Sequence, residues 1–223
     1  MRSRWVGRWK EGESSFEPDY AAIMIQTVIF DLGKVLVDFD YSIATNKIAE
    51  RSKIRAAQFD QILLEGLLFR YEQGHITTEQ FFREVCVATG FCGALEEFAT
   101  SFGDIFTPIE SMIQLHQALC QRGLPTYIFS NTNDLAIQHI RRRFPFFSNF
   151  TGHILSYEHG AMKPNPKLYE VVEAQSGRRG AELLYLDDRP ENIETGAARG
   201  WQVILQETPE KTRKAFAELG LIS

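Results

Sequence analysis

The chain has 223 residues, of which 44% are hydrophobic, and this is enough for a substantial core and excludes a disordered protein. Its formal net charge of −5 argues against nucleic acid or an anionic membrane as the main partner. The three cysteines include no Cys-x-x-Cys pair, so the sequence predicts neither a disulfide framework nor a zinc site and favours a cytoplasmic protein.

Residues 1–22 are interpreted as an N-terminal extension. They mix Arg, Trp, Glu and Gly without the apolar stretch of a signal peptide, and no apolar run in the chain reaches the ~18 residues of a membrane span. Met24 stands just before the first predicted strand. The extension is therefore either a segment that docks on the core or on a partner, or the result of a start codon placed too early.

The first predicted strand covers the apolar run 23–30, which is rich in β-branched and aromatic residues and ends at Asp31. Gly33 and Lys34 lie in the loop that follows. In open α/β sheets, ligands bind at the carboxyl edge of the strands. Asp31 is therefore the first candidate site residue.

The pattern between residues 41 and 107 changes to that of helices, with apolar residues at spacings of three to five. Thr77 and Gln80 have the spacing of a capping box, and Gly90 is placed to end the helix that they begin. This pattern predicts a helical insertion after the Asp31 loop.

Strands and helices alternate through the rest of the chain. Strands are predicted near residues 125–129, 152–157, 182–187 and 201–205. Such alternation implies an α/β fold with a Rossmann-like parallel sheet and helices on both faces. The core would then consist of residues 23–40 and 108–223.

Further polar residues follow these strands or lie in short loops. Ser130 and Asn131 come after the second strand, Asp187 and Asp188 come at the end of a later one, and Lys163 stands in a proline-rich loop. A carboxylate can attack phosphorus, and carboxylate pairs can hold Mg²⁺. Lysine and serine can hold phosphate oxygens, so the set suits phosphoryl transfer.

Four segments resemble, in order, the four motifs of the haloacid dehalogenase (HAD) superfamily. They are residues 30–33, 129–133, 162–164 and 186–193, and the resemblance covers nearly the whole chain from about residue 23. It implies that Asp31 is the nucleophile and that Ser130 and the Asn131 backbone bind phosphate. It also implies that Lys163 neutralises the negative charge of Asp31 and of the phosphate. It also implies a Mg²⁺ site with these ligands: Asp31, the backbone carbonyl of Gly33, Asp187 and Asp188. Asn192 is expected to orient the acidic loop.

Gly33 departs from the pattern of most phosphatases of this superfamily, which carry a second acid two residues after the nucleophile. General acids contribute roughly 10²–10⁴-fold, so its absence favours a substrate with a good leaving group. An anomeric sugar phosphate is such a substrate, and the motifs are most similar to those of bacterial α-D-glucose-1-phosphate phosphatases. Lys34 is either a substitute proton donor or a solvated loop lysine.

The insertion 41–107 resembles the small helical cap of the superfamily, which closes over the site. Its polar loop 69–75 is expected to bind the leaving group, with Glu72 on sugar hydroxyls and Tyr71 stacked on a ring. The alternative is that Tyr71 packs inside the cap and Glu72 is solvated.

The sequence therefore predicts a Mg²⁺-dependent phosphatase for a small phosphorylated metabolite such as glucose 1-phosphate, with no nucleic-acid or membrane partner. One alternative is a non-catalytic phosphate-binding protein of the same fold. A second is a haloacid dehalogenase, which also lacks the second acid but is not expected to keep both Asp187 and Asp188. A phosphonatase would need a cap lysine, and neither Lys47 nor Lys53 lies in a recognisable motif. The sequence makes no prediction of the oligomeric state.

Overall fold

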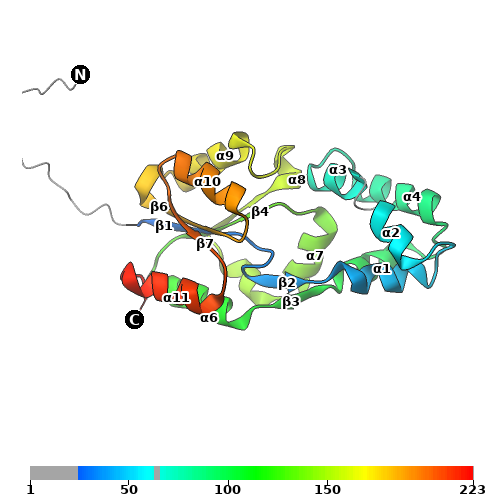
Figure 1. Cartoon of the computed structure of the whole chain (residues 1–223), viewed down its shortest axis with the longest axis horizontal. Coiled ribbons are helices and arrows are strands. Elements are labelled where there is room, and N and C mark those ends of the chain that lie inside the picture. Colours follow the sequence, from blue (N-terminus) through cyan, green and yellow to red (C-terminus); the bar gives the residue numbers. More distant parts are fainter. Residues whose placement is uncertain (1–24, 63–65, 223) are drawn as a thin grey trace, which may run out of the picture.

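The computed structural model describes residues 25–62 and 66–222 (Figure 1). The predicted extension 1–22 and the first two residues of the run 23–30 lie outside the described residues. Within the described ranges, the helices are too short or too polar to cross a bilayer.

A five-stranded sheet forms the centre of the molecule, and its neighbouring strands pair in parallel. The strand order is β5-β4-β1-β6-β7 (Figure 1). The strands are β1 (Thr27–Phe30), β4 (Thr126–Ser130), β5 (Gly152–Leu155), β6 (Leu183–Asp187) and β7 (Gln202–Leu205). The predicted α/β fold with a Rossmann-like parallel sheet is confirmed.

Helices cover both faces of the sheet because side chains alternate along each strand. Val28 and Phe30 point into one hydrophobic cluster, and Ile29 points into the other. The first face is covered by α6 (Glu110–Gln121), α7 (Asp134–Arg143) and α11 (Pro209–Glu218). The second face is covered by α9 (Pro166–Ser176) and α10 (Pro190–Ala198). Short helical turns complete this part: η2 (Pro145–Asn149), α8 (Ser156–His159) and η3 (Gly180–Glu182).

Five helices of the described ranges lie together beyond the carboxyl edge of the sheet (Figure 1). They are α1 (Tyr41–Ala49), α2 (Ala56–Ile62), α3 (Leu68–Glu72), α4 (Thr78–Thr89) and α5 (Leu95–Gly103). Their buried side chains form a separate, aromatic-rich core around Phe81 and Phe98. The predicted capping box of Thr77 and Gln80 is present, and α4 ends at Gly90 in the left-handed conformation.

A two-stranded antiparallel ribbon connects this helical region to the sheet. It consists of β2 (Val37–Phe39) and β3 (Phe106–Pro108). The sequence analysis did not predict either strand, because three residues are too few to show an alternating pattern. The ribbon carries the chain from the Asp31 loop into the helices and back.

Candidate active site

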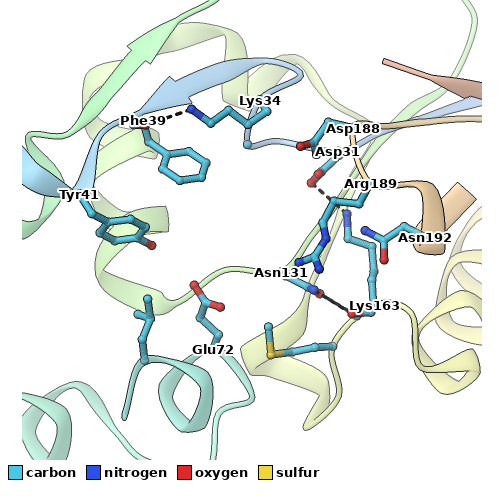
Figure 2. A pocket seen from close by; sticks show the side chains of 13 residues that line it. Asp31, Lys34, Phe39, Tyr41, Glu72, Asn131, Lys163, Asp188, Arg189 and Asn192 are labelled. Atoms are coloured by element: carbon cyan, nitrogen blue, oxygen red, sulfur yellow. Dashed lines mark hydrogen bonds and ion pairs between the residues drawn. The ribbon is translucent and has the colours of Figure 1, made fainter. Parts of the chain in front are cut away.

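A cavity of about 250 Å³ lies between the carboxyl edge of the sheet and helices α1 and α3 (Figure 2). Seven predicted site residues line it: Asp31, Gly33, Lys34, Glu72, Asn131, Lys163 and Asp188. Ser130 lines a smaller adjoining recess of about 70 Å³, which shares Gly33, Glu72 and Asn131 with the main cavity. Parallel strands bring these residues together because their carboxyl ends share one edge.

Asp31 directly follows β1, and its backbone N–H donates to the carbonyl of Leu186 at 2.9 Å. Its Oδ1 accepts from the N–H of Leu32 at 2.6 Å and lies 3.0 Å from the Lys163 ammonium. Oδ2 has no donor among the described residues. Burial raises the pKa of Asp31 to about 7, although Lys163 acts in the opposite direction. One oxygen of a largely buried carboxylate is thus held in place and the other is free.

Lys163 is buried beneath the cavity and uses all its ammonium protons. It donates to the carbonyl of Phe129 at 2.8 Å and to Asp187 Oδ2 at 2.6 Å, and it pairs with Asp31 at 3.0 Å. Burial disfavours its charge, but the two carboxylates outweigh burial and raise the pKa of Lys163. The ammonium is therefore a fixed positive charge beside Asp31.

Asp187 ends β6, is fully buried, and has both oxygens occupied. Oδ2 accepts from Lys163 and from the hydroxyl of Tyr185. Oδ1 accepts from the backbone N–H of Arg189 and from Asn192 Nδ2, each at 2.9 Å. A carboxylate offers about four lone-pair positions. Asp187 is therefore saturated by protein donors, and Asn192 orients the acidic loop as predicted.

Asp188 is the accessible member of the acidic pair and lies beside Asp31 at the cavity (Figure 2). Oxygens of Asp31, Asp187 and Asp188 lie within 4.8 Å of one another. Burial, and then the charge of Asp187, raise the pKa of Asp188. Three carboxylates around one lysine leave an excess of negative charge, and hard oxygen ligands of this kind suit Mg²⁺. The donor set therefore fits a divalent cation, with Asp188 as its accessible carboxylate and Asp31 beside it.

The Asn131 side chain fixes the loop that carries Lys163. Its Nδ2 donates to the Lys163 carbonyl at 3.0 Å, and its Oδ1 accepts from the Lys163 N–H at 2.7 Å. Neighbouring Ser130 is 2% exposed, and its hydroxyl donates to the Asn131 carbonyl at 3.3 Å. The structure thus brings both residues to the site, where the Asn131 amide holds protein backbone.

Gly33 lies against an aromatic side chain. A Cβ atom at position 33 would come within 2.9 Å of Phe39 Cε1. Lys34 has a left-handed backbone with φ of 58°, and its ammonium bonds to Asp38 and to the Phe39 carbonyl at 3.2 Å. That ammonium also lies 4.5 Å from the centre of the Phe39 ring. Lys34 is therefore engaged locally at the rim of the cavity.

Glu72 and Tyr71 are neighbours in sequence but lie in different surroundings. Glu72 lines the cavity, opposite Asp31 (Figure 2). Tyr71 is 2% exposed and stacks on Phe81 inside the helical region, with ring centres 4.4 Å apart. Its hydroxyl accepts from the N–H of Leu135 at 3.1 Å. The prediction that Tyr71 stacks on a ligand is therefore corrected: it packs the helical core and anchors that core to α7.

Several cavity residues were missed by the sequence analysis. They are Phe39, Tyr41, Leu68, Met162 and Arg189. Most come from the helical region or the ribbon, where sequence spacing does not show which side chains face the sheet. Tyr185 was also missed, although its place two residues before Asp187 in a strand puts both on one side. The alternation of side chains along the strand could therefore have identified Tyr185 from the sequence.

Comparisons with known proteins agree with the active site described above. A family model described as haloacid dehalogenase-like hydrolase matches residues 25–200. The chain is 23% identical over 193 residues to a D-ribitol-5-phosphate phosphatase of Bacteroides thetaiotaomicron, covering 82% of this chain and 93% of that protein. It is 24% identical over 178 residues to a sesquiterpene phosphatase of Aspergillus oryzae, covering 78% of this chain and 86% of that one.

Solved structures show the same fold. A crystal structure of a HAD family enzyme from B. thetaiotaomicron superposes with a TM-score of 0.76 at 22% identity, covering 86% of this chain and 98% of that one. An L-2-haloacid dehalogenase from Xanthobacter autotrophicus gives a TM-score of 0.59 at 20% identity, covering 87% and 83%. The family match spans most of the chain, so the protein belongs to the haloacid dehalogenase-like hydrolases.

Proposed function

We propose that this protein is a Mg²⁺-dependent phosphatase that hydrolyses a small phosphomonoester through an aspartyl-phosphate on Asp31. The observation that carries the proposal is the Asp31 carboxylate itself. One of its oxygens is fixed by Leu32 and Lys163, and the other is free at a cavity with a second accessible carboxylate, Asp188. This is the arrangement that a positioned nucleophile beside a cation site requires.

The free Oδ2 of Asp31 attacks phosphorus, and the bond between phosphorus and the leaving oxygen breaks. Lys163 favours the ionised form of Asp31 and offsets negative charge at the phosphate. Ser130 and the backbone of Asn131 bind phosphate oxygens from the adjoining recess. Asp188, the Gly33 carbonyl and the Asp31 oxygen that does not attack would hold Mg²⁺, while Asp187 orients Lys163 rather than binding metal directly. Bound Mg²⁺ supplies charge neutralisation of the phosphate oxygens.

Relatives support phosphate monoesters as the substrate class. The D-ribitol-5-phosphate phosphatase and the sesquiterpene phosphatase are both phosphatases by name. A HAD family enzyme of the same fold, with a TM-score of 0.69, forms a complex with magnesium and inorganic phosphate. These likenesses agree with the chemistry of the carboxylates and Lys163.

The finer proposal is a sugar phosphate such as glucose 1-phosphate. The cavity volume of about 250 Å³ suits a small metabolite. Phe39 and Tyr41 give it an aromatic wall on which a sugar ring can pack, and Glu72 can accept from a hydroxyl. Residues 41–107 would act as the cap that closes over this ligand.

A haloacid dehalogenase is disfavoured by the acidic group. Oxygens of Asp31, Asp187 and Asp188 lie within 4.8 Å of one another, and Lys163 forms ion pairs with two of these three carboxylates. A cation relieves this repulsion. A dehalogenase attacks carbon without a metal, so Asp187 and Asp188 together would have no role in it. A non-catalytic binding protein is disfavoured because the free Asp31 oxygen serves attack rather than binding.

The test is phosphate release with and without Mg²⁺ from glucose 1-phosphate, glucose 6-phosphate and p-nitrophenyl phosphate. We expect metal-dependent turnover that favours the 1-phosphate over the 6-phosphate. Asp31→Asn should lower turnover by at least about 10⁴-fold because the nucleophile is lost. Full activity of Asp31→Asn would contradict the covalent mechanism, and a lack of turnover by the unmodified protein on all three substrates would contradict phosphatase function.

A further inference from the structure

Glu72 is a cavity carboxyl for which the described part of the chain provides no partner. Among the described residues, its side chain has no hydrogen bond and no ion pair, and burial is the one cause that shifts its pKa. Asp31 and Asp187, by contrast, are both bonded to Lys163. A half-buried carboxyl that faces a cavity and has no partner is available to a ligand.

The position of Glu72 is nevertheless fixed relative to the sheet. Its backbone carbonyl accepts from the Ser156 hydroxyl at 2.6 Å, and the Ser156 oxygen accepts from the N–H of Thr132 at 2.9 Å. Two residues further on, Gly74 fits so closely that a Cβ atom there would lie 2.0 Å from the Tyr157 carbonyl oxygen. Glu72 therefore extends from the end of α3, which is held against the segments that follow β4 and β5.

Glu72 lies on the wall opposite the nucleophile. Figure 2 shows Asp31 and Asp188 on one side of the cavity and Glu72 on the other. In phosphoryl transfer the attacking and leaving oxygens are roughly in line. A phosphate attacked by Asp31 would thus direct its leaving oxygen away from the strand edge, toward the wall that carries Glu72. Glu72 also lines the recess that contains Ser130, where the two cavities join.

Position 33, two residues after the nucleophile, cannot supply an acid that protonates the leaving oxygen. Residue 33 is glycine, and the Phe39 ring occupies the space that a side chain there would enter. The Lys34 ammonium is bonded to Asp38 and the Phe39 carbonyl. On the wall opposite Asp31, Glu72 is therefore the carboxyl among the described residues that is free to exchange a proton with the leaving group.

Building on the proposed phosphatase function, we propose that Glu72 is the general acid and base of the reaction and replaces the acid missing at position 33. In the first step Asp31 forms a bond to phosphorus, the bond to the leaving oxygen breaks, and protonated Glu72 gives its proton to that oxygen. In the second step the Glu72 carboxylate takes a proton from water, whose oxygen attacks phosphorus. The bond between phosphorus and Asp31 then breaks, phosphate is released, and Glu72 is protonated again.

The environment of Glu72 supports this role. Burial raises its pKa from 4.5 to about 7, so both protonation states are populated near neutral pH, as an acid–base residue requires. Burial and the charge of Glu72 also raise the pKa of Tyr41, whose hydroxyl thus stays protonated. The ionisable groups that share the cavity with Glu72 are Lys34 and Tyr41 and, across from them, Asp31, Lys163, Asp188 and Arg189.

The test compares Glu72→Gln with the unmodified protein on p-nitrophenyl phosphate, which has a good leaving group, and on glucose 6-phosphate, which has a poor one. We expect kcat/KM to fall about 10²–10³-fold for the sugar phosphate and only about 3-fold or less for the aryl ester, because nitrophenolate leaves without protonation. Slow attack by water should also give a burst of about one nitrophenolate per active site, since the phosphoenzyme accumulates. For the sugar phosphate, the decrease in kcat/KM above about pH 7 should be absent from the variant.

Glu96→Gln is the matched control, because Glu96 is an exposed carboxylate on α5 of the same helical region. Inhibition by inorganic phosphate checks that the Glu72→Gln site remains intact. Equal losses on both substrates, or no loss on either, would overturn the role of Glu72 and leave the phosphatase proposal standing. If the unmodified protein hydrolyses neither ester with Mg²⁺, the phosphatase proposal itself fails.

Discussion

The two walls of the cavity are built in different ways. On the strand side, Lys163 and Asp187 have every polar atom paired, and two strand ends and one tight loop hold them in place. On the helical side, Glu72 has no partner among the described residues and lines the cavity with Phe39, Tyr41 and Leu68. The strand-side wall thus pairs its buried Lys163 and Asp187, whereas the described residues leave the Glu72 carboxyl on the other wall unpaired.

This difference indicates a division of labour. A saturated network is rigid, because moving any member leaves a buried polar group unpaired at a cost of about 1–3 kcal/mol. Such a wall suits the covalent step, which depends on a fixed distance between nucleophile and phosphate. A wall of aromatic rings and one free carboxyl can accept different leaving groups. Substitutions on the two walls should therefore have different consequences.

The largest contrast is expected within the acidic pair. Asp187→Asn places an amide among four donors, and we expect a loss of about 3–5 kcal/mol in the free energy of unfolding. Asp188→Asn should leave stability nearly unchanged and raise the Mg²⁺ concentration for half-maximal activity by at least about 10²-fold. Denaturant unfolding and Mg²⁺ titration of phosphate release measure these effects. A normally stable Asp187→Asn protein would show that Asp187 serves the metal rather than the network.

A smaller loss of stability is expected from a substitution at Gly33, where the two walls meet. Gly33→Asp introduces a Cβ only 2.9 Å from Phe39, whose ring also contacts Tyr41 at 5.5 Å and Phe106 at 6.2 Å between ring centres. We expect the single variant to lose about 1–3 kcal/mol of stability through overpacking, with little gain in turnover of glucose 6-phosphate.

Removal of the ring should change that outcome. In the Glu72→Gln background, Gly33→Asp combined with Phe39→Ala should turn over glucose 6-phosphate faster than Phe39→Ala alone, because an acid then again reaches the leaving oxygen. Gly33→Ala is the matched control, since it adds the Cβ without the carboxyl. If Gly33→Asp alone accelerated this substrate, the Phe39 ring would not be the obstacle.

The strand side of the site could be predicted from the sequence because strand ends have fixed neighbours. Asp31, Ser130 and Asp187 each lie at the carboxyl end of a strand, and parallel pairing places those ends side by side. The order of the motifs then fixed the family, and the comparisons confirm it. The saturation of Asp187 depends on Tyr185, Arg189 and Asn192 together, which motif spacing alone does not show.

The helical side could not be predicted because it depends on helix phase. Tyr71 and Glu72 were equally plausible ligand residues in one polar segment. Successive side chains on a helix point about 100° apart, so only one of the two can face the sheet. The packing of Tyr71 on Phe81 decides which one does. Such packing depends on contacts between α3 and α4 that the sequence does not specify.

The smallest expected effect is on stability and comes from Glu72. Burial raises its pKa from 4.5 to about 7, so the folded state favours the protonated form. This contribution to stability is fully present below about pH 4.5 and is lost as the pH rises through about 7. Glu72→Gln should therefore match the unmodified protein near pH 4.5 and exceed its unfolding free energy by up to about 2 kcal/mol near pH 8, after allowance for partial solvent access. Urea unfolding at both pH values measures this, with Glu96→Gln as control. A Glu72→Gln protein that is less stable near pH 8 would mean that the carboxylate is neutralised, and the contrast between the two walls would then disappear.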